Sequence, residues 1–282
     1  MKKIFKDFSL ILSVYNKTDP YLLTKSFKSI LNQYFLPNEI LIMLDGPLKV
    51  RQSFIINSFI SKNRKKIKIK IFRNKQNLGI AVSYNKLISN TCNEIIAIQD
   101  SDDVSSYMRF YYQYNLLSTL KKYSVIGSNV YENDILEQKK TQKKMPSSYK
   151  FIKKRCKLSN PINHPTVMFK KKNLLKYNYE NFHRMEDYYL WIRMLSDNIF
   201  FMNIDKYLVT MNLDKNFFLR RKDFKILINE LKIQKLLFKH KFNNFFEMIL
   251  LTVIKIIYHV FPNNLKKILR KNLLSFFSKN QK

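Results

Sequence analysis

Glycine, cysteine and acidic residues are all scarce in this chain of 282 residues. It has only three glycines and two cysteines. The segment after the first apolar run, SVYNKTDP, therefore lacks the glycine-rich turn on which a dinucleotide-binding dehydrogenase depends, and collagen-like or linker-rich architectures are excluded. Cys92 and Cys156 have no C-x-x-C spacing and no histidine at zinc spacing. We expect two buried thiols in a reducing compartment, without a disulfide or a zinc centre.

Acidic residues number 20 against 52 lysines and arginines, so the formal net charge is +32. This charge attracts polyanions such as a nucleic acid, an anionic membrane or a phosphorylated substrate. An AT-rich coding sequence would also enrich lysine together with Asn, Ile, Phe and Tyr, so the charge alone does not choose among these partners. The alternative to an enzyme is a basic nucleic-acid-binding or membrane-surface protein. A nucleic-acid-binding face would cluster basic and aromatic residues, whereas here the basic residues are spread out, and we expect no nucleic-acid partner.

The amino-terminal sequence MKKIFKDFSLILSVYN is similar in composition to a short signal peptide. Asp7 interrupts its apolar run, and no small-residue cleavage site follows. We therefore expect a first strand here.

Strand-like and helix-like patterns alternate up to about residue 110. Strands are expected at 8–15, 39–46, 67–74 and 93–103, and helices at 19–33, 51–62 and 77–90. This alternation predicts an α/β fold with a Rossmann-like, mainly parallel sheet flanked by helices. Further on, helices are expected at 109–123 and 185–198, strands at 123–131, 163–171 and 199–212, and a mobile basic loop at 139–150.

Three of the scarce acids follow an apolar strand in IIAIQDSDDV, residues 95–104. Asp45 ends the earlier strand EILIMLDG, and ligands of parallel sheets bind beyond such strand ends. Two aspartates spaced D-x-D suit Mg²⁺ or Mn²⁺ carrying a diphosphate, because hard oxygen ligands bind these ions and the phosphates complete the shell. The alternative is that one of these residues caps a helix beginning near Val104. A cap would explain one carboxylate but not three.

The second acidic cluster is Glu186–Asp187 in MEDYYLWIRML. On a helix, Asp187 shares a face with Trp191 and Met194. An apolar indole beside a carboxylate raises its pKa, which suits a general base that takes a proton from a sugar hydroxyl. The alternative is that both acids favour a helix amino terminus through the helix dipole. His164, in NPINHPTV, has either a structural role or, if it faces the metal, a role as a Mn²⁺ ligand or a diphosphate hydrogen-bond donor.

Together these segments resemble the family-2 glycosyltransferases, which have the GT-A fold. The likeness is closest to the bacterial surface-polysaccharide branch that includes the amylovoran-biosynthesis type. The segments that carry it are SVYNKTDPYLLTKSFKSILNQ, IMLDGP, NLGIAVSYN, QDSDDVSSYMRF, NPINHPTVMFKK and EDYYLWIRML, which cover about residues 8–213. The resemblance implies a nucleotide-sugar-binding half at 1–110 and an acceptor-binding half at 111–219 of one domain.

The resemblance also implies roles for the donor-binding residues. Ser13 and Tyr15 would line the nucleotide pocket, Asp45 would accept a hydrogen bond from the base, with uracil N3–H as the expected donor, and Asp100 would face the ribose. The family loop after N-x-G carries a basic residue that contacts the diphosphate, but Val82, Ser83 and Tyr84 occupy that region here. Lys86 or Arg73 would have to substitute. The proline that precedes Arg109 in the family is also absent.

For the chemistry, the resemblance implies a metal bound by Asp102, supported by Asp103. Asp187 would be the catalytic base, and Glu186 would orient the acceptor or the base. The reaction would be inverting, because the acceptor hydroxyl attacks the anomeric carbon from the face opposite the diphosphate. The expected donor is a UDP-hexose or UDP-N-acetylhexosamine, and the expected acceptor is a polyprenyl-diphosphate-linked unit of O-antigen, capsule or exopolysaccharide.

The tail, residues 220–282, is basic, with 15 Lys/Arg against 3 Asp/Glu. Its most apolar piece, FFEMILLTVIKIIYHVF, is short for a membrane-spanning helix and contains Glu247, Lys255 and His259. We expect a helix in the headgroup plane with its lysines toward anionic lipid, on the cytoplasmic face of the plasma membrane. The alternative is an amphipathic helix packed on the catalytic domain.

Overall fold

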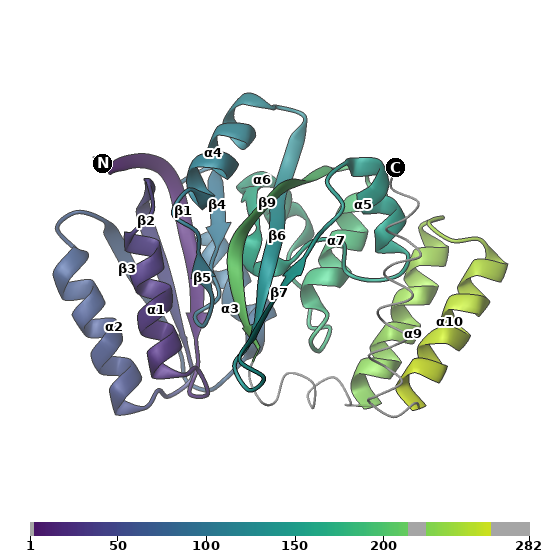
Figure 1. Cartoon of the computed structure of the whole chain (residues 1–282), viewed down its shortest axis with the longest axis horizontal. Helices are drawn as coiled ribbons and strands as arrows, with labels where there is room; N and C mark the ends of the chain where they lie inside the picture. Colours follow the sequence, from purple (N-terminus) through teal and green to yellow (C-terminus); the bar gives the residue numbers. More distant parts are fainter. Residues whose placement is uncertain (1–2, 214–223, 261–282) are drawn as a thin grey trace.

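The computed structural model describes residues 3–213 and 224–260, which form an α/β fold around one mixed sheet (Figure 1). The nine strands are β1 (Ile4–Val14), β2 (Phe35–Asp45), β3 (Lys68–Asn74), β4 (Ile95–Ile98), β5 (Val104–Ser105), β6 (Tyr123–Asp134), β7 (Lys139–Lys143), β8 (Met168–Lys170) and β9 (Phe200–Leu213). Their spatial order is β3-β2-β1-β4-β8-β6-β9-β5, and β7 pairs with β6. Both expected halves of the domain therefore share one sheet.

Strand direction divides the sheet into two parts. The strands β1 to β4 pair only in parallel with one another, as the strand–helix alternation predicts. The strand β8 then pairs antiparallel with both β4 and β6, while β6 and β9 are parallel. As a result, the carboxyl ends of β1, β2 and β4 lie at one edge, where parallel sheets bind ligands.

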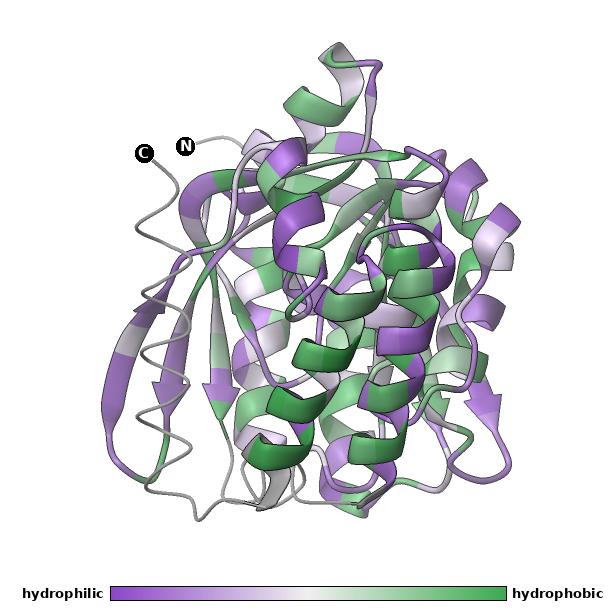
Figure 2. Cartoon of the chain, turned by 90° about the vertical axis from the view of Figure 1, so that its right-hand side faces the viewer, coloured by the Kyte–Doolittle hydropathy of each residue, from purple (hydrophilic) through white to green (hydrophobic). Residues whose placement is uncertain are grey.

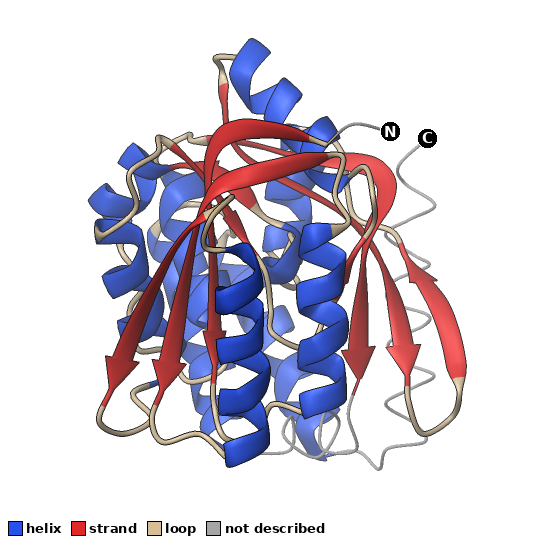
Figure 3. Ribbon diagram, turned by 90° about the vertical axis from the view of Figure 1, so that its left-hand side faces the viewer, coloured by secondary structure: helices blue, strands red, loops and turns tan. Residues whose placement is uncertain are grey.

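Helices cover both faces of the sheet because buried side chains alternate along the strands. In β1, Leu10 and Leu12 pack on one face and Ile11 on the other. The helices are α1 (Pro20–Leu31), α2 (Val50–Asn63), α3 (Gly79–Ser89), α4 (Arg109–Thr119), α5 (Tyr149–Cys156), η1 (His164–Thr166, a 3₁₀ turn), α6 (Lys171–Tyr177), α7 (Glu186–Ser196), α9 (Phe224–Lys239) and α10 (Phe245–Val260). The helices α1, α2 and α4 pack on the first face, with α1 and α2 in front of the strands in Figure 3. The second face packs against α3, α5, α6, α7 and α9.

Two expectations about local structure are wrong. The basic segment 139–150 is not a loop throughout, because Lys139–Lys143 forms β7 against β6 and Tyr149 begins α5. An exposed edge strand is held by backbone hydrogen bonds and tolerates lysines, so its polar composition concealed it. Cys92 is exposed, and only Cys156 is buried. Burial raises the pKa of the Cys156 thiol.

The described part of the tail is helical, as expected. The helix α9 packs on the domain through Ile226, Ile233 and Leu237, and α10 packs beside α9 at the outer edge of the molecule (Figure 1). Residues 261–271, FPNNLKKILRK, lie outside the described residues. Within 3–213 and 224–260, every helix is too short or too polar to cross a bilayer.

Candidate active site

Asp45 ends β2 at the ligand-binding edge and holds the turn that follows β3. Its Oδ1 accepts hydrogen bonds from Asn74 Nδ2 at 2.8 Å and from the Leu78 backbone N–H at 2.9 Å. Its Oδ2 accepts from the Gly79 N–H at 3.0 Å. A carboxylate has about four acceptor positions, so one remains for a nucleotide base.

The loop after β1 is held against the acidic segment 100–103. The buried Gln52 side chain donates from Nε2 to the carbonyls of Tyr15 at 3.1 Å and Thr18 at 2.6 Å. The Thr18 hydroxyl is 3.2 Å from the Ser101 hydroxyl. Tyr15 and the acidic segment are therefore neighbours, while β1, which carries Ser13, lies between β2 and β4. Asp45 and Asp100 are two strands apart, about 10 Å at ordinary strand spacing.

Arg109 holds the residues on either side of the acidic segment 100–103 by hydrogen bonds. Its buried guanidinium donates to the Ile98 carbonyl at 2.6 Å, to Gln99 Oε1 at 3.0 Å and to the Ser105 hydroxyl at 2.9 Å. Burial lowers the pKa of Arg109 to about 9, although the charges of Asp100 and Asp103 oppose this. Arg109 is therefore still a cation at neutral pH. Val104–Ser105 is strand β5, so the capped helix considered for this position is wrong.

Asp103 turns away from solvent toward β9. The residue is 3% exposed, and its carboxylate accepts a hydrogen bond from the Asn212 N–H at 2.9 Å. Burial, with the charges of Asp102 and Asp100, raises its pKa well above the usual range. The Asn212 side chain donates to the Asp102 carbonyl at 2.6 Å, so β9 fixes the backbone that presents Asp102.

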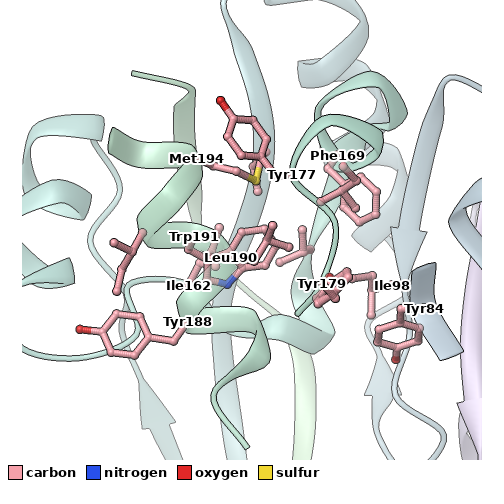
Figure 4. Packing of buried hydrophobic residues seen from close by; sticks show 14 of the residues in the cluster. Tyr84, Ile98, Ile162, Phe169, Tyr177, Tyr179, Tyr188, Leu190, Trp191 and Met194 are labelled. Carbon is pink, nitrogen blue, oxygen red and sulfur yellow. The ribbon is translucent and has the colours of Figure 1, made fainter. Parts of the chain in front are cut away.

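His164 lies beside Asp100 at the centre of the site. Its Nδ1 is 3.8 Å from Asp100 Oδ1, and its Nε2 is 3.1 Å from the Tyr179 hydroxyl. Its ring stacks on Tyr84, whose hydroxyl donates to Asp100 Oδ1 at 3.2 Å. In Figure 4, Tyr84 and Tyr179 lie side by side near Ile98, at the end of β4. These rings enclose one side of the Asp100 carboxylate.

Asn160 joins the second acidic cluster to the segment that carries the same histidine. Asp187 is in the first turn of α7, and its Oδ2 accepts a hydrogen bond from Asn160 Nδ2 at 2.6 Å. Asn160 and His164 belong to one short segment, NPINH. Burial alone would lower the pKa of His164, but hydrogen bonding and charge from Asp100, with the charges of Asp187 and Glu186, outweigh it and raise this pKa. The segment 160–164 therefore contacts both acidic clusters, which are far apart in sequence.

The helix α7 is itself anchored in the core. Trp191 is fully buried and packs edge-on against Phe201 of β9 at 5.6 Å between ring centroids. Figure 4 shows Trp191 and Leu190 directed into the cluster between α7 and the sheet. The fixed helix holds Glu186 and Asp187 in its first turn, where the helix dipole favours acids. The two acids therefore also have the helix-stabilising position considered as the alternative to a catalytic role.

The acidic residues suit a divalent ion only in part. No three His, Cys, Asp or Glu side chains within 3–213 and 224–260 form a group that could hold a metal ion. However, Mg²⁺ commonly uses one or two carboxylates and completes its shell with water and substrate phosphate, and the partly exposed Asp100 and Asp102 fit that pattern. Asp103 is engaged by Asn212, and the raised pKa of His164 favours the imidazolium, which has no free lone pair. Metal ligation by these two stays a prediction.

Lys86 is not brought to this cluster. It lies on the exposed side of α3, and its Nζ is 3.4 Å from the Arg73 carbonyl. Tyr84, on the buried side of the same helix, contacts Asp100 instead. A diphosphate contact from Lys86 or Arg73 stays a prediction.

Five supporting side chains were not identified as site residues from the sequence. They are Gln52, Tyr84, Arg109, Asn160 and Tyr179. Three of the five, Tyr84, Arg109 and Asn160, lie in segments that carry the family resemblance, so motif membership was an available signal for them. Gln52 had none, because its partners are backbone carbonyls more than 30 residues away.

Comparison with known proteins identifies the family of this chain. Residues 9–178 match the model of glycosyl transferase family 2. The UDP-Gal:alpha-D-GlcNAc-diphosphoundecaprenol beta-1,3-galactosyltransferase of Escherichia coli is 28% identical over 272 residues, covering 96% of this chain and 97% of that protein. The amylovoran biosynthesis glycosyltransferase AmsE of Erwinia amylovora is 25% identical over 230 residues, covering 81% and 85%.

A solved structure with a similar fold is the mannosyltransferase PcManGT from Pyrobaculum calidifontis, in complex with GDP-Man and Mn²⁺. Its TM-score is 0.62 at 8% identity, over 95% of this chain and 79% of that one. The expected GT-A fold and the family resemblance are both confirmed. This chain belongs to glycosyl transferase family 2.

Proposed function

We propose that this protein is an inverting glycosyltransferase of surface-polysaccharide synthesis. It moves a sugar from a nucleoside diphosphate to a hydroxyl of a polyprenyl-diphosphate-linked glycan. The observation that carries the proposal is that one short segment, 160–164, contacts both acidic clusters: Asn160 donates to Asp187 at 2.6 Å, and His164 lies 3.8 Å from Asp100. Transfer needs a donor site and a base within one bound donor's reach. The Escherichia coli relative, matched over nearly its whole length, supports UDP-hexose as donor and a diphosphoundecaprenol-linked acceptor.

The donor half of the site would bind the nucleotide across the ends of β1, β2 and β4. Asp45 accepts from the base, Ser13 and Tyr15 line the pocket, and Asp100 faces the ribose. Asp102 would hold the divalent ion, which would supply positive charge to the departing diphosphate. The buried Arg109 cation limits repulsion among these acids before donor and ion arrive.

The acceptor half supplies the base. The Asp187 carboxylate takes the proton from the acceptor hydroxyl as its oxygen forms a bond to the anomeric carbon. The bond from that carbon to the diphosphate oxygen breaks, and its electron pair leaves with the nucleotide. Asn160 donates to Asp187 Oδ2 at 2.6 Å and the Tyr188 N–H donates to Oδ1 at 2.8 Å, so the carboxylate is held in one orientation, with lone pairs left for the proton. Glu186 orients the acceptor.

The lipid-linked acceptor would place the enzyme at a membrane surface. We assign it to the cytoplasmic face of the plasma membrane, where nucleotide sugars are available. The basic tail from residue 220 supports this assignment through its excess of lysine and arginine.

Replacement of the proposed base tests the mechanism. Asp187→Asn should lower the rate of sugar transfer by about 10²- to 10⁴-fold, the range of a general base, with donor binding unchanged. The matched control is Asp205→Asn, an exposed aspartate that pairs with Lys144. Transfer rates come from release of the nucleoside diphosphate and binding from calorimetry. Wild-type transfer by a folded Asp187→Asn protein would remove Asp187 as the base.

A further inference from the structure

The outer surface of α10 is apolar along its described length. Its exposed side chains follow helical spacing at i, i+3, i+4 and i+7 from Phe246, which is 81% exposed. The exposed apolar residues are Phe245, Phe246, Ile249, Leu250, Val253, Ile256 and Ile257. Phe238, at the end of α9, extends this surface and lies 6.2 Å from the Phe245 ring. Figure 2 faces this side of the molecule and shows hydrophobic residues along the front helices.

Both charged side chains of α10 between Phe245 and Ile257 pair with neighbouring helices. Glu247 pairs with Lys157 at the end of α5 at 3.0 Å, and Lys255 pairs with Glu230 of α9 at 2.9 Å. These two are the charged residues of α10 between Phe245 and Ile257. A helix that faces only water keeps its charges outside, so the apolar outer surface of α10 is typical of a contact surface for a protein or a membrane. The expectation that Lys255 would face lipid is wrong, because Glu230 holds it inward.

A basic cavity opens where α10 begins. It has a volume of about 270 Å³. Its lining residues are Lys153, Lys154, Lys157, Ser196, His240, Lys241 and Phe242. Glu247 pairs with one of these lysines, which leaves the lining with an excess of positive charge. Cationic side chains beside exposed phenylalanines are typical of surfaces that lie at the boundary of headgroups and acyl chains.

We propose that the outer surface of α10, with the basic cavity at its start, docks the enzyme on a bilayer that contains anionic phospholipid. The apolar side chains enter the acyl boundary, and the cavity receives a lipid phosphate. The inference rests on the proposed function, which assigns the enzyme to a membrane surface, and it names the part of the tail that makes this contact.

A second copy of this chain is a poorer occupant. Two α10 surfaces packed in parallel would bring two basic cavities close together, and like charges oppose such a contact. An antiparallel pair would separate the cavities and leave both without an anionic partner. An anionic bilayer is complementary to both parts of the surface at once. The helix α9, which carries α10, also contacts the loop before α7, where Asn229 Nδ2 donates to the His183 carbonyl at 3.2 Å. Docking would therefore be connected to the helix that carries the proposed base.

The apolar part is tested by co-sedimentation of the full chain with vesicles of phosphatidylcholine alone or with 30% phosphatidylglycerol (roughly the content that gives a strong surface charge). Phe246→Ser/Leu250→Ser should weaken binding to the anionic vesicles at least about tenfold, because each side chain loses its burial in lipid. The matched control is Phe54→Ser on α2, which is 73% exposed at the opposite edge of the molecule and should bind as the wild type does.

The basic part is tested on the same vesicles. Lys154→Gln/Lys241→Gln should weaken binding more than the control pair Lys62→Gln/Lys65→Gln, which removes equal charge from the end of α2. Inorganic phosphate at matched ionic strength should not displace the protein if lipid is the ligand. Displacement by phosphate alone would assign the cavity to a soluble anion and overturn its role in docking.

Failure of this inference is distinguishable from failure of the proposed function. Vesicle binding is measured without donor, and transfer is measured separately with a short-chain, water-soluble acceptor. The Phe246→Ser/Leu250→Ser protein should retain that transfer and lose transfer to an acceptor embedded in anionic vesicles. Vesicle binding by the Phe246→Ser/Leu250→Ser protein equal to that of the wild type would overturn the proposal. So would a wild-type dimer in sedimentation velocity that this double variant no longer forms, because the surface would then bind a second copy of the chain.

Discussion

At the scale of single residues, two buried acids show how their partners decide ionisation. Asp103 is buried beside Asp102 and Asp100, so burial and like charges raise its pKa. Burial also favours the neutral form of Glu39, but the Cys92 N–H, Lys70 and Ser9 all bond its carboxylate and together lower its pKa to about 2. Lys70 Nζ lies 2.8 Å from Glu39 Oε1. Ionised Glu39 thus stabilises the fold. Burial and the neighbouring acids instead disfavour the ionised form of Asp103.

Glu39 predicts a pH-dependent stability. Its folded pKa of about 2 is below the usual 4.5, so its contribution is complete above about pH 4.5 and is lost as the pH falls toward 2. Glu39→Gln should reduce the free energy of unfolding at pH 7 by about 3 kcal/mol, and the difference from the wild type should shrink between pH 5 and pH 2. Urea unfolding across this pH range measures the effect.

The control for this experiment is Glu94→Gln, which alters an exposed acid in the connection to β4. It should leave stability within about 0.5 kcal/mol of the wild type. A gap between wild type and Glu39→Gln that persists at pH 2 would contradict the ionic origin of the effect.

At the scale of elements, the site depends on how closely the segment 160–166 lies against β6 and β9. Gly127 in β6 is the point of closest approach. A Cβ added there would collide with Ile162 and with the Asn203 side-chain oxygen. The Asn203 amide in turn donates to the Pro161 carbonyl at 3.1 Å. The absence of a side chain at position 127 therefore allows the segment that carries Asn160 and His164 to approach the sheet.

Gly127→Ala should consequently affect both stability and transfer. We expect a loss of about 1–3 kcal/mol from overpacking, together with slower transfer because the His164 segment must shift. Denaturant unfolding and transfer rates measure the two effects. Ile162→Ala in the same chain should relieve part of the clash, so the two changes should be less than additive. Full additivity would show that Gly127 and Ile162 do not interact.

At the scale of the whole molecule, the site lies where the parallel half of the sheet meets the antiparallel half. The strand β4 leads into Asp100 and Asp102, and β8 beside it follows the segment with His164. The proposed base comes from α7, packed on the same sheet. A bound donor would contact both halves, so it should stabilise the folded chain as one unit.

Ligand binding should therefore raise the melting temperature. UDP-galactose with Mn²⁺ at 100-fold its dissociation constant should add about 2.7 kcal/mol of stability. Chelation of the ion should remove most of this effect, and Asp102→Asn should lose the part that depends on Mn²⁺ while keeping the part due to the nucleotide. Thermal unfolding with UDP, GDP and dTDP sugars measures it. A melting temperature that no nucleoside diphosphate sugar moves would contradict the donor site.

The sequence by itself determined the parallel strands, the start of the first helix and the position of two acids at strand ends. The apolar alternation through residue 110 predicted the parallel strands, and Asp19–Pro20 predicted the start of α1, where the Asp19 carboxylate accepts from Tyr21 and Leu22 N–H. Asp45 and Asp100 were expected at one edge because parallel strands end together. These features are local, or follow from strand direction, and so they can be read along the chain.

Tertiary structure alone decided which side chains meet. The Asn160 bond to Asp187, the Arg109 support of the acidic segment and the Gln52 contact with the first loop join residues whose sequence spacing carries no signal. The direction of Lys255 was also decided there, because only the packing of α10 on α9 sets its Glu230 partner. Composition records how many charges a helix has. Which of its faces meets water depends on what the rest of the fold places against it.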